Sequence, residues 1–181
     1  ETLHDINLRV KPGEHIAIVG YNGAGKTTLV KLLMRLYDPS KGKISWHGED
    51  VKNYKPREYR KRFGVVFQDF QMYGASLAEN VILDKLSDKD FEKEKFEITT
   101  ALESAGFESR LKKLPLGLKT QVTTEFDKNG VDFSGGESQK IAISRAFYKK
   151  ADILIMDEPS SALDPIAEKK LYDKIYTMME Q

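Results

Sequence analysis

A glycine-rich stretch that ends in lysine and threonine constrains the fold of this 181-residue chain more than any other feature. Residues 20–27 read Gly-Tyr-Asn-Gly-Ala-Gly-Lys-Thr and fit the pattern G-x-x-x-x-G-K-[ST]. The apolar run at residues 15–19 precedes this stretch and predicts a buried strand, whereas residues 28–36 follow it with leucines at helical spacing. A strand, a glycine loop and a helix in this order predict a phosphate-binding loop.

The residue types in this loop suit a polyphosphate. Glycines let the backbone curl close to the ligand, so that successive N–H groups point at it beside the positive end of the following helix. Lys26 can reach the β- and γ-phosphates, and the hydroxyl of Thr27 can bind Mg²⁺. For the loop alone, the alternative is a glycine-rich turn that binds nothing. The residues expected to contact nucleotide here are Gly20, Asn22, Gly23, Ala24, Gly25, Lys26, Thr27 and Thr28.

Composition excludes several classes of protein. The content of 40% hydrophobic and 31% charged residues is typical of a globular protein. A net charge of +1 gives no argument for nucleic acid or an anionic membrane surface as a partner, and no direct nucleic-acid contact is expected. The absence of cysteine excludes disulfides and thiolate metal sites. No apolar run approaches the ~20 residues that a membrane helix needs.

The character of the chain changes in its middle third. Residues 3–10 alternate in polarity, which predicts a half-buried strand, but after residue 76 the chain becomes rich in Lys, Asp and Glu. Apolar positions between 91 and 105 predict an amphipathic helix that ends at Gly106, with the charged run 88–97 on its solvated face. The predicted division is a sheet core of residues 1–75 and 150–181 with an inserted helical lobe of residues 76–149.

Two carboxylates close the apolar run at residues 152–157. A buried parallel strand delivers its last residues to the ligand edge of an α/β sheet. Asp157 can hold Mg²⁺ there directly or through water, and Glu158 can polarise the water that attacks the γ-phosphate. The alternative is a pair of acids in a surface loop, and the loop at residues 20–27 favours catalysis instead.

A capping box is predicted at residues 134–137. Ser134 caps a helix that begins near Gly135, and the side chain of Glu137 reaches back to it. Gly135 and Gly136 also expose backbone N–H groups at the positive end of that helix, which makes a second anion site. A second phosphate-contacting surface in one chain makes most sense if it faces the nucleotide of another molecule.

Taken in order, these motifs resemble those of the nucleotide-binding domain of ATP-binding cassette (ABC) proteins. The similar segments are the Walker A at residues 20–28, the Q-loop at Gln68, the signature at residues 133–137, the Walker B at residues 153–157 with Glu158, and the D-loop at residues 161–164. The resemblance implies an α/β fold: a P-loop NTPase core with a mixed, largely parallel sheet, an antiparallel β subdomain and an inserted α-helical lobe.

The resemblance also implies ligands, roles and partners. ATP and Mg²⁺ would bind, with Lys26, Gln68 and Glu158 in catalysis and with Thr27, Gln68 and Asp157 at the metal. Two nucleotide-binding domains would form a head-to-tail dimer, in which Ser134, Gly135, Gly136 and Glu137 of one subunit contact the ATP bound by the other. Gln68 would sense the nucleotide and link it to a partner domain, the alternative being an ordinary surface amide.

Two segments are similar to the exporter branch of the family. They are residues 68–70 and 76–80, which in exporters lie where transmembrane helices couple to this domain. Residues 124–130 lie where exporters carry their X-loop, although a polar loop that feeds the capping box fits equally well. The implied function is ATP hydrolysis that powers transport, at the cytoplasmic face of a cell membrane, with a transmembrane domain fused or separate. The alternatives are a soluble ABC ATPase acting on nucleic acid or ribosomes, and a non-catalytic nucleotide switch.

Two elements of the family's site fall outside this sequence. The adenine-stacking aromatic residue belongs upstream of the first strand, and the switch histidine belongs beyond the helix in which the chain stops. His4, His15 and His47 lie too far upstream for that role and are expected to be ordinary strand or turn residues. We therefore expect the isolated chain to bind nucleotide weakly and to hydrolyse it poorly.

The signature departs from the family pattern at two positions. Phe133 replaces a leucine, which is a tolerable apolar exchange, and Glu137 replaces the usual glutamine. A carboxylate near the partner's γ-phosphate should repel it unless the capping box holds it back. The substitution Glu137→Gln is therefore expected to tighten ATP-driven dimerisation slightly in light-scattering measurements. Equal or weaker dimerisation of that variant would contradict the prediction.

Overall fold

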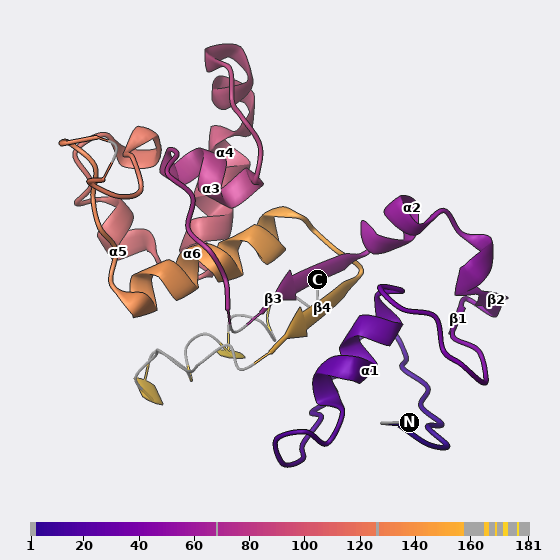
Figure 1. The fold of residues 1–181 in the computed structure, drawn as a ribbon. Coiled ribbons are helices and arrows are strands. Elements are labelled where there is room, and N and C mark those ends of the chain that lie inside the picture. The colour runs from indigo at the N-terminus through magenta and orange to yellow at the C-terminus, as the bar shows by residue number, and fades with distance from the viewer. Residues whose placement is uncertain are drawn as a thin grey trace. The chain divides into compact units, whose positions relative to one another are not determined.

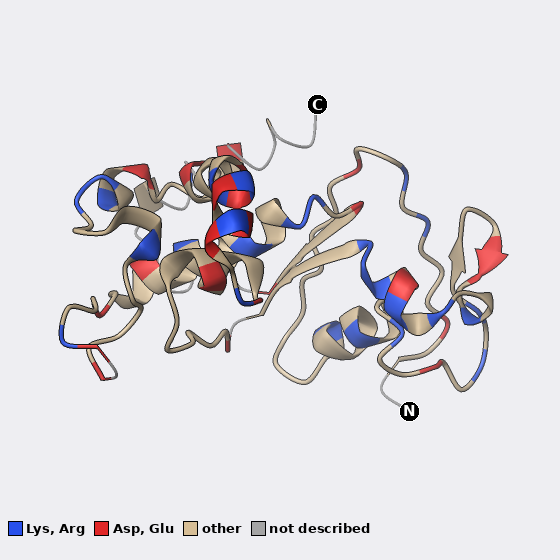
Figure 2. Cartoon of the chain, turned by 90° about the horizontal axis from the view of Figure 1, so that it is seen from above, with Lys and Arg blue, Asp and Glu red and all other residues tan. Residues whose placement is uncertain are grey.

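The computed structural model describes residues 3–67, 69–125 and 127–157, together with Pro165, Ile166, Lys169, Tyr172, Asp173 and Thr177. The chain divides into two compact units, Glu1–Phe63 and Gly64–Met179, which are described separately below (Figure 1). Basic and acidic residues are interspersed along the chain (Figure 2). The isolated residues described beyond Asp157 have helical backbone.

The first unit combines one longer helix with a small hairpin and two short helical turns. Its elements are α1 (Lys26–Leu33), β1 (Ser45–Trp46), β2 (Glu49–Asp50), the 3-10 helix η1 (Val51–Asn53) and α2 (Pro56–Arg60). The strands pair antiparallel, with Ser45 opposite Asp50. The turn residues His47 and Gly48 both have left-handed φ values, 50° and 86°. Two such residues form a type I′ turn, whose twist matches that of a two-residue hairpin. Because Gly48 adopts a positive φ easily, it favours the turn at this position.

Helix α1 ends earlier than the leucine spacing predicts. Arg35 adopts a left-handed conformation with φ 53°. The N–H of Arg35 donates to the carbonyl of Leu32 (2.9 Å), and the N–H of Leu36 donates to that of Lys31 (2.9 Å). These are the two bonds of a Schellman motif, so the backbone itself ends the helix before the Pro- and Gly-containing stretch at residues 38–42.

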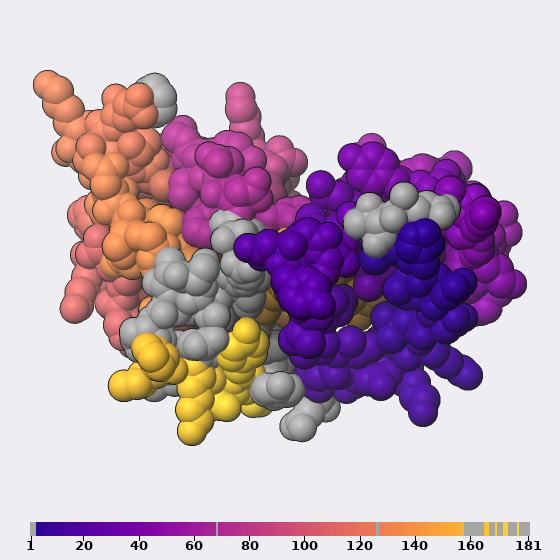
Figure 3. All heavy atoms as spheres, turned by 60° about the horizontal axis from the view of Figure 1, so that its bottom comes forward, coloured from indigo at the N-terminus to yellow at the C-terminus, as the bar shows by residue number. Residues whose placement is uncertain are grey.

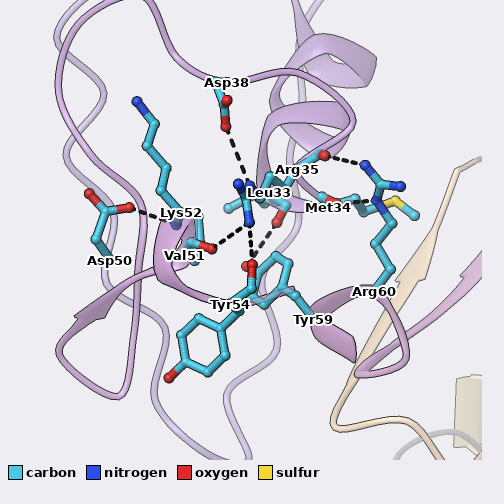
Figure 4. A network of polar contacts seen from close by, with 10 residues as sticks. All are labelled: Leu33, Met34, Arg35, Asp38, Asp50, Val51, Lys52, Tyr54, Tyr59 and Arg60. Carbon is cyan, nitrogen blue, oxygen red and sulfur yellow. Dashed lines mark hydrogen bonds and ion pairs between the residues drawn. The ribbon is translucent and has the colours of Figure 1, made fainter. Parts of the chain in front are cut away.

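The Arg35 side chain then ties the helix end to the segment after the hairpin (Figure 4). Its Nη1 donates to the carbonyls of Val51 (3.0 Å) and Tyr54 (2.6 Å). Its Nε lies 3.5 Å from a carboxylate oxygen of Asp38. One half-buried guanidinium therefore donates to carbonyls in η1 and the following turn, where the carbonyl of Val51 also accepts from the N–H of Tyr54 (3.2 Å).

Two side chains of α2 satisfy the last carbonyls of α1 (Figure 4). The Tyr59 hydroxyl donates to the carbonyl of Leu33 (2.9 Å). The Arg60 guanidinium donates to the carbonyls of Met34 (3.3 Å) and Arg35 (2.6 Å). A helix end leaves its final carbonyls without intrahelical partners, so these bonds fix α2 against the end of α1.

The strands predicted at residues 3–10 and 15–19 are not formed. The paired strands among the described residues are β1 with β2 and β3 with β4, and neither stretch joins them. Ile6 is 53% exposed and Ile18 is 42% exposed. The space-filling view shows indigo atoms of the N-terminal segment on the surface (Figure 3). A strand needs a partner for its N–H and C=O groups, and alternating polarity does not supply one.

The second unit is mainly helical. Its elements are β3 (Phe63–Val66), α3 (Leu77–Ile82), α4 (Asp88–Ser104), α5 (Glu108–Leu111), the 3-10 helix η2 (Gly117–Lys119), α6 (Gly135–Tyr148) and β4 (Ile153–Met156). The strands β3 and β4 run parallel as a pair, and the N–H of Asp157 donates to the carbonyl of Val66 (2.9 Å) (Figure 1). The sequence predictions of strands at residues 63–67 and 152–157 are confirmed.

The core of this unit lies where α3, α4 and α6 pack together. Its fully buried side chains include Leu77, Ile98, Leu102, Ile141 and Ile143. Helix α4 is the predicted amphipathic helix, with its charged residues outside. It ends where Gly106 takes a φ of 77° and the N–H of Phe107 donates to the carbonyl of Leu102 (2.9 Å). No helix among the described residues has the length and apolar character needed to cross a membrane.

The helices α3 to α6 fall within the range predicted for the inserted lobe. The contact pattern divides the chain after Phe63, however, and not at residue 76. The lobe boundaries at 76 and 149 therefore stay a prediction.

We expect Tyr59→Phe to lower the free energy of unfolding by about 1 kcal/mol, because the carbonyl of Leu33 loses its donor. Burial raises the pKa of Tyr59, so its hydroxyl stays a donor at neutral pH. Urea denaturation measures the change. The exposed Tyr37 offers a matched control, and Tyr37→Phe should leave the unfolding free energy unchanged. Equal effects of the two substitutions would contradict this account.

Candidate functional site

The glycine loop before α1 has the backbone shape that its sequence predicts. Gly23 and Gly25 have φ values of 84° and 93°, in the left-handed region that favours glycine. The N–H of Ala24 donates to the carbonyl of Tyr21 (3.1 Å), which closes the loop on itself. A Cβ on Gly20 would lie 3.1 Å from the Cβ of Ala24, so this position also favours glycine.

The start of α1 carries no side-chain cap. Gly25 precedes the helix, and its first turn contains no acidic residue. The first N–H groups of a helix have no intrahelical acceptor, and an anion bound in the loop can accept from them. This arrangement fits a phosphate group.

Lys26 lies over the loop. Its Nζ donates to the carbonyls of Gly20 (2.7 Å) and Tyr21 (3.2 Å). A cation in the first turn of a helix is unfavourable beside the positive helix end, and the two carbonyls partly offset this. A phosphate in the same loop would offset it further. Thr27 follows with an exposed side chain, so the structure brings a cation, a hydroxyl and backbone N–H groups to one loop.

The predicted capping box at the start of α6 is confirmed. The N–H of Glu137 donates to the hydroxyl oxygen of Ser134 (3.3 Å), and the N–H of Ser134 donates to Oε2 of Glu137 (2.9 Å). Gly135 is exposed and Gly136 is half-buried, so the helix start remains accessible.

A residue that the sequence did not indicate joins this box. The Nε of Arg110 lies 2.9 Å from Oε1 of Glu137. This N–H lacks hydrogen-bond geometry, so the contact is an ion pair held by charge. The guanidinium also lies over the ring of Phe133, 5.7 Å from its centre, and that ring meets Phe107 edge-on at 5.7 Å. Arg110 is distant in sequence, and no local spacing rule pairs it with the signature.

Asp157 takes the predicted place at the end of β4. Its backbone bond to Val66 puts it beside the end of β3, the strand that leads to position 68. Gln68, Glu158 and the predicted D-loop at residues 161–164 lie outside the described residues. Within the part of the chain that is described, no group of His, Cys, Asp and Glu residues is arranged to hold a metal ion.

The segment that follows position 68 is fixed by Asn80, which is fully buried in α3. Its Oδ1 accepts from the N–H of Tyr73 (2.9 Å) and from Nη2 of Arg145 (3.1 Å), and its Nδ2 donates back to the carbonyl of Tyr73 (2.9 Å). The Nε of Arg145 donates to the carbonyl of Asn80 (2.8 Å). Desolvation lowers the pKa of Arg145. Sequence reasoning missed this cluster, which links α6 to the segment after position 68.

A second capping box starts α3. Ser76 donates to Oε2 of Glu79 from its N–H (3.0 Å) and its hydroxyl (2.7 Å). Burial raises the pKa of Glu79, but the hydrogen bonds from Ser76 outweigh it and hold that pKa below its ordinary value. Residues 76–80, one of the two segments similar to the exporter branch, therefore form a capped helix start.

The described part of the loop at residues 124–130 is tied at Thr124 to Asp132, two residues before Ser134. The hydroxyl of Thr124 donates to Asp132 (2.6 Å), and the N–H of Thr124 donates to its other carboxylate oxygen (3.1 Å). These bonds hold the pKa of Asp132 below its ordinary value. Both interpretations of this loop, X-loop and polar connection, stay open.

Comparison with known proteins identifies the family. A family model described as ABC transporter matches residues 3–161. The nisin transport ATP-binding protein NisT of Lactococcus lactis subsp. lactis is 42% identical over 178 residues, which are 98% of this chain and 29% of that protein. The chain belongs to the ABC transporter family, and the predicted fold class is confirmed.

Other relatives share this pattern. An ATP-dependent lipid A-core flippase of Burkholderia pseudomallei (strain 1710b) is 37% identical, over 99% of this chain and 28% of its own length. The structure of a bacterial Atm1-family ABC exporter with ATP bound matches with a TM-score of 0.83 and 32% identity, over 98% of this chain and 30% of that one. The chain therefore spans less than a third of the length of these relatives.

We expect Asn80→Ala to lower the free energy of unfolding by about 2 kcal/mol or more, because it leaves the N–H of Tyr73 without its acceptor and leaves Nη2 of Arg145 with only the sulfur of Met72 (3.8 Å). Urea denaturation measures the loss. Asn129→Ala, in an exposed turn, is the matched control and should change the unfolding free energy by less than about 0.5 kcal/mol. A small effect at position 80 would show that this cluster does not hold the segment.

Proposed function

We propose that this chain is the nucleotide-binding domain of an exporter, and that it binds and hydrolyses ATP to power transport across a membrane. The conformation of the glycine loop carries the proposal. Left-handed Gly23 and Gly25 precede an uncapped helix, and Lys26 lies over the loop carbonyls. This combination suits a polyphosphate, and the loop residues 21–24 are exposed and open to a ligand.

The chemistry follows from the residues in sequence. The loop N–H groups and Lys26 would hold the phosphates and stabilise the charge that develops on them. By analogy with the family, Thr27, Gln68 and Asp157 would hold Mg²⁺, which would neutralise phosphate charge. Glu158 would orient the attacking water and accept its proton.

A second nucleotide-binding domain completes the proposed site. The start of α6, with Ser134, Gly135 and Gly136, offers backbone donors at a positive helix end. In a head-to-tail dimer, these donors would contact the γ-phosphate of an ATP held by the partner's glycine loop. Hydrolysis removes that contact and would open the dimer.

The names of the relatives favour transport over the other candidates. They include transport ATP-binding proteins for nisin and subtilin and a lipid A-core flippase. By analogy, a transmembrane domain would couple to the segment after Gln68, and the chain would work at the cytoplasmic face of a membrane. A soluble ABC ATPase that acts on nucleic acid or ribosomes is less favoured. A non-catalytic switch is also less favoured, because it would not need Glu158.

Glu158→Gln in the intact protein is expected to reduce ATP turnover by about 100-fold or more while ATP binding persists, because the amide cannot accept a proton from water. The variant should accumulate an ATP-bound dimer, measured by light scattering and by retained nucleotide. Turnover equal to that of the parent protein would rule out the role proposed for Glu158.

Two controls make this test specific. Glu92→Gln makes the same chemical change at an exposed residue of α4 and should leave turnover unchanged. Lys26→Ala should abolish ATP binding itself. If Lys26→Ala binds and hydrolyses ATP like the parent protein, the assignment of the glycine loop is wrong.

A further inference from the structure

We propose that Arg110 is a positioning residue of the signature: its charge neutralises Glu137, so that the start of α6 can approach a phosphate. The inference rests on the proposed function, in which this helix start faces the partner's nucleotide. It goes further by assigning a task to a residue outside every motif of the sequence.

The geometry divides the two oxygens of Glu137 between two tasks. Oε2 accepts from the N–H of Ser134 and completes the capping box at 2.9 Å. Oε1 lies 2.9 Å from Nε of Arg110. The box alone would leave a full negative charge at the helix start. Arg110 brings the sum of the two side-chain charges to zero.

The capping box of α3 provides an internal comparison. There Glu79 also accepts from Ser76 through Oε2, but its Oε1 accepts from the backbone N–H of Leu86 (3.4 Å). At α3 the second carboxylate oxygen therefore has a neutral hydrogen-bond donor, and the charge of Lys85 is only the last of the causes that lower the pKa of Glu79. At α6 a cation lies against the second oxygen directly.

Electrostatics explain why a cation matters at this place. A carboxylate within a few ångströms of a bound phosphate lies well inside the screening length of about 8 Å at physiological salt. Its repulsion would weaken nucleotide contact, whereas the backbone N–H groups favour it. The Glu137 and Arg110 side chains are 28% and 34% exposed, so the ion pair is partly shielded from water.

Packing is the competing role for Arg110. Its guanidinium covers the ring of Phe133, so truncation could disturb the signature without any effect of charge. A double-mutant cycle separates the two roles, because the charge role depends on Glu137 and the packing role does not.

The cycle compares Arg110→Met, Glu137→Gln and the double variant in the intact protein, with the KM for MgATP and kcat as readouts. We expect Arg110→Met to raise KM about fivefold with a smaller change in kcat, and Glu137→Gln in the same chain to remove most of that increase. Arg110→Lys keeps the charge and should stay within about twofold of the parent KM. Raising the salt concentration should shrink the effect of Arg110→Met.

Lys112→Met is the matched control, because Lys112 lies beside α5 and pairs with Glu108 instead of the signature. It should leave KM unchanged, and thermal unfolding checks that each variant is folded. An equal rise in KM with Glu or Gln at position 137 would overturn the proposal in favour of packing, and no rise at all would also overturn it. If the parent protein hydrolyses no ATP, or if its hydrolysis does not depend on Lys26, the result would instead count against the proposed function.

Discussion

Unpaired backbone groups at helix ends organise the described parts of this chain. The last carbonyls of α1 are satisfied by Tyr59 and Arg60 of α2, which fixes these helices to each other. The starts of α3 and α6 are closed by serine–glutamate boxes. Only α1 among these three begins after glycine without a side-chain cap. The N–H groups at that start have no side-chain acceptor from the capping residue, so they are available to bind the phosphate of the proposed function.

The sequence predicted those features that depend on neighbours along the chain. The glycine loop, the box at Ser134, the helix end at Gly106 and the strands β3 and β4 all follow from short-range spacing, and the structure has them. The predicted strands at residues 3–10 and 15–19 failed because a strand exists only with a partner, and polarity alternation identifies a face without identifying that partner.

Contacts between residues far apart in the sequence could not be predicted from local spacing. The ion pair of Arg110 with Glu137 and the bonds of Asn80 with Arg145 join residues that only the tertiary fold brings together. Both involve donors with several possible acceptors, so composition cannot choose among them. Membership in the ABC transporter family fixes the order of the motifs, but it does not tell how this chain accommodates an acid where the resemblance leads one to expect glutamine.

The two helix starts that the proposed function assigns to phosphate differ in charge. At α1, Lys26 adds a full positive charge to the backbone donors. At α6, Glu137 and Arg110 cancel, so that backbone donors act without a net side-chain charge. A cationic loop attracts any polyphosphate, before and after hydrolysis, because charge attraction acts over several ångströms. Neutral N–H donors bind only at hydrogen-bond distance, so their contribution requires that one particular phosphate be in place. In the proposed dimer, such a pairing of surfaces would let one subunit retain the nucleotide while the contact with the other subunit depends on the γ-phosphate.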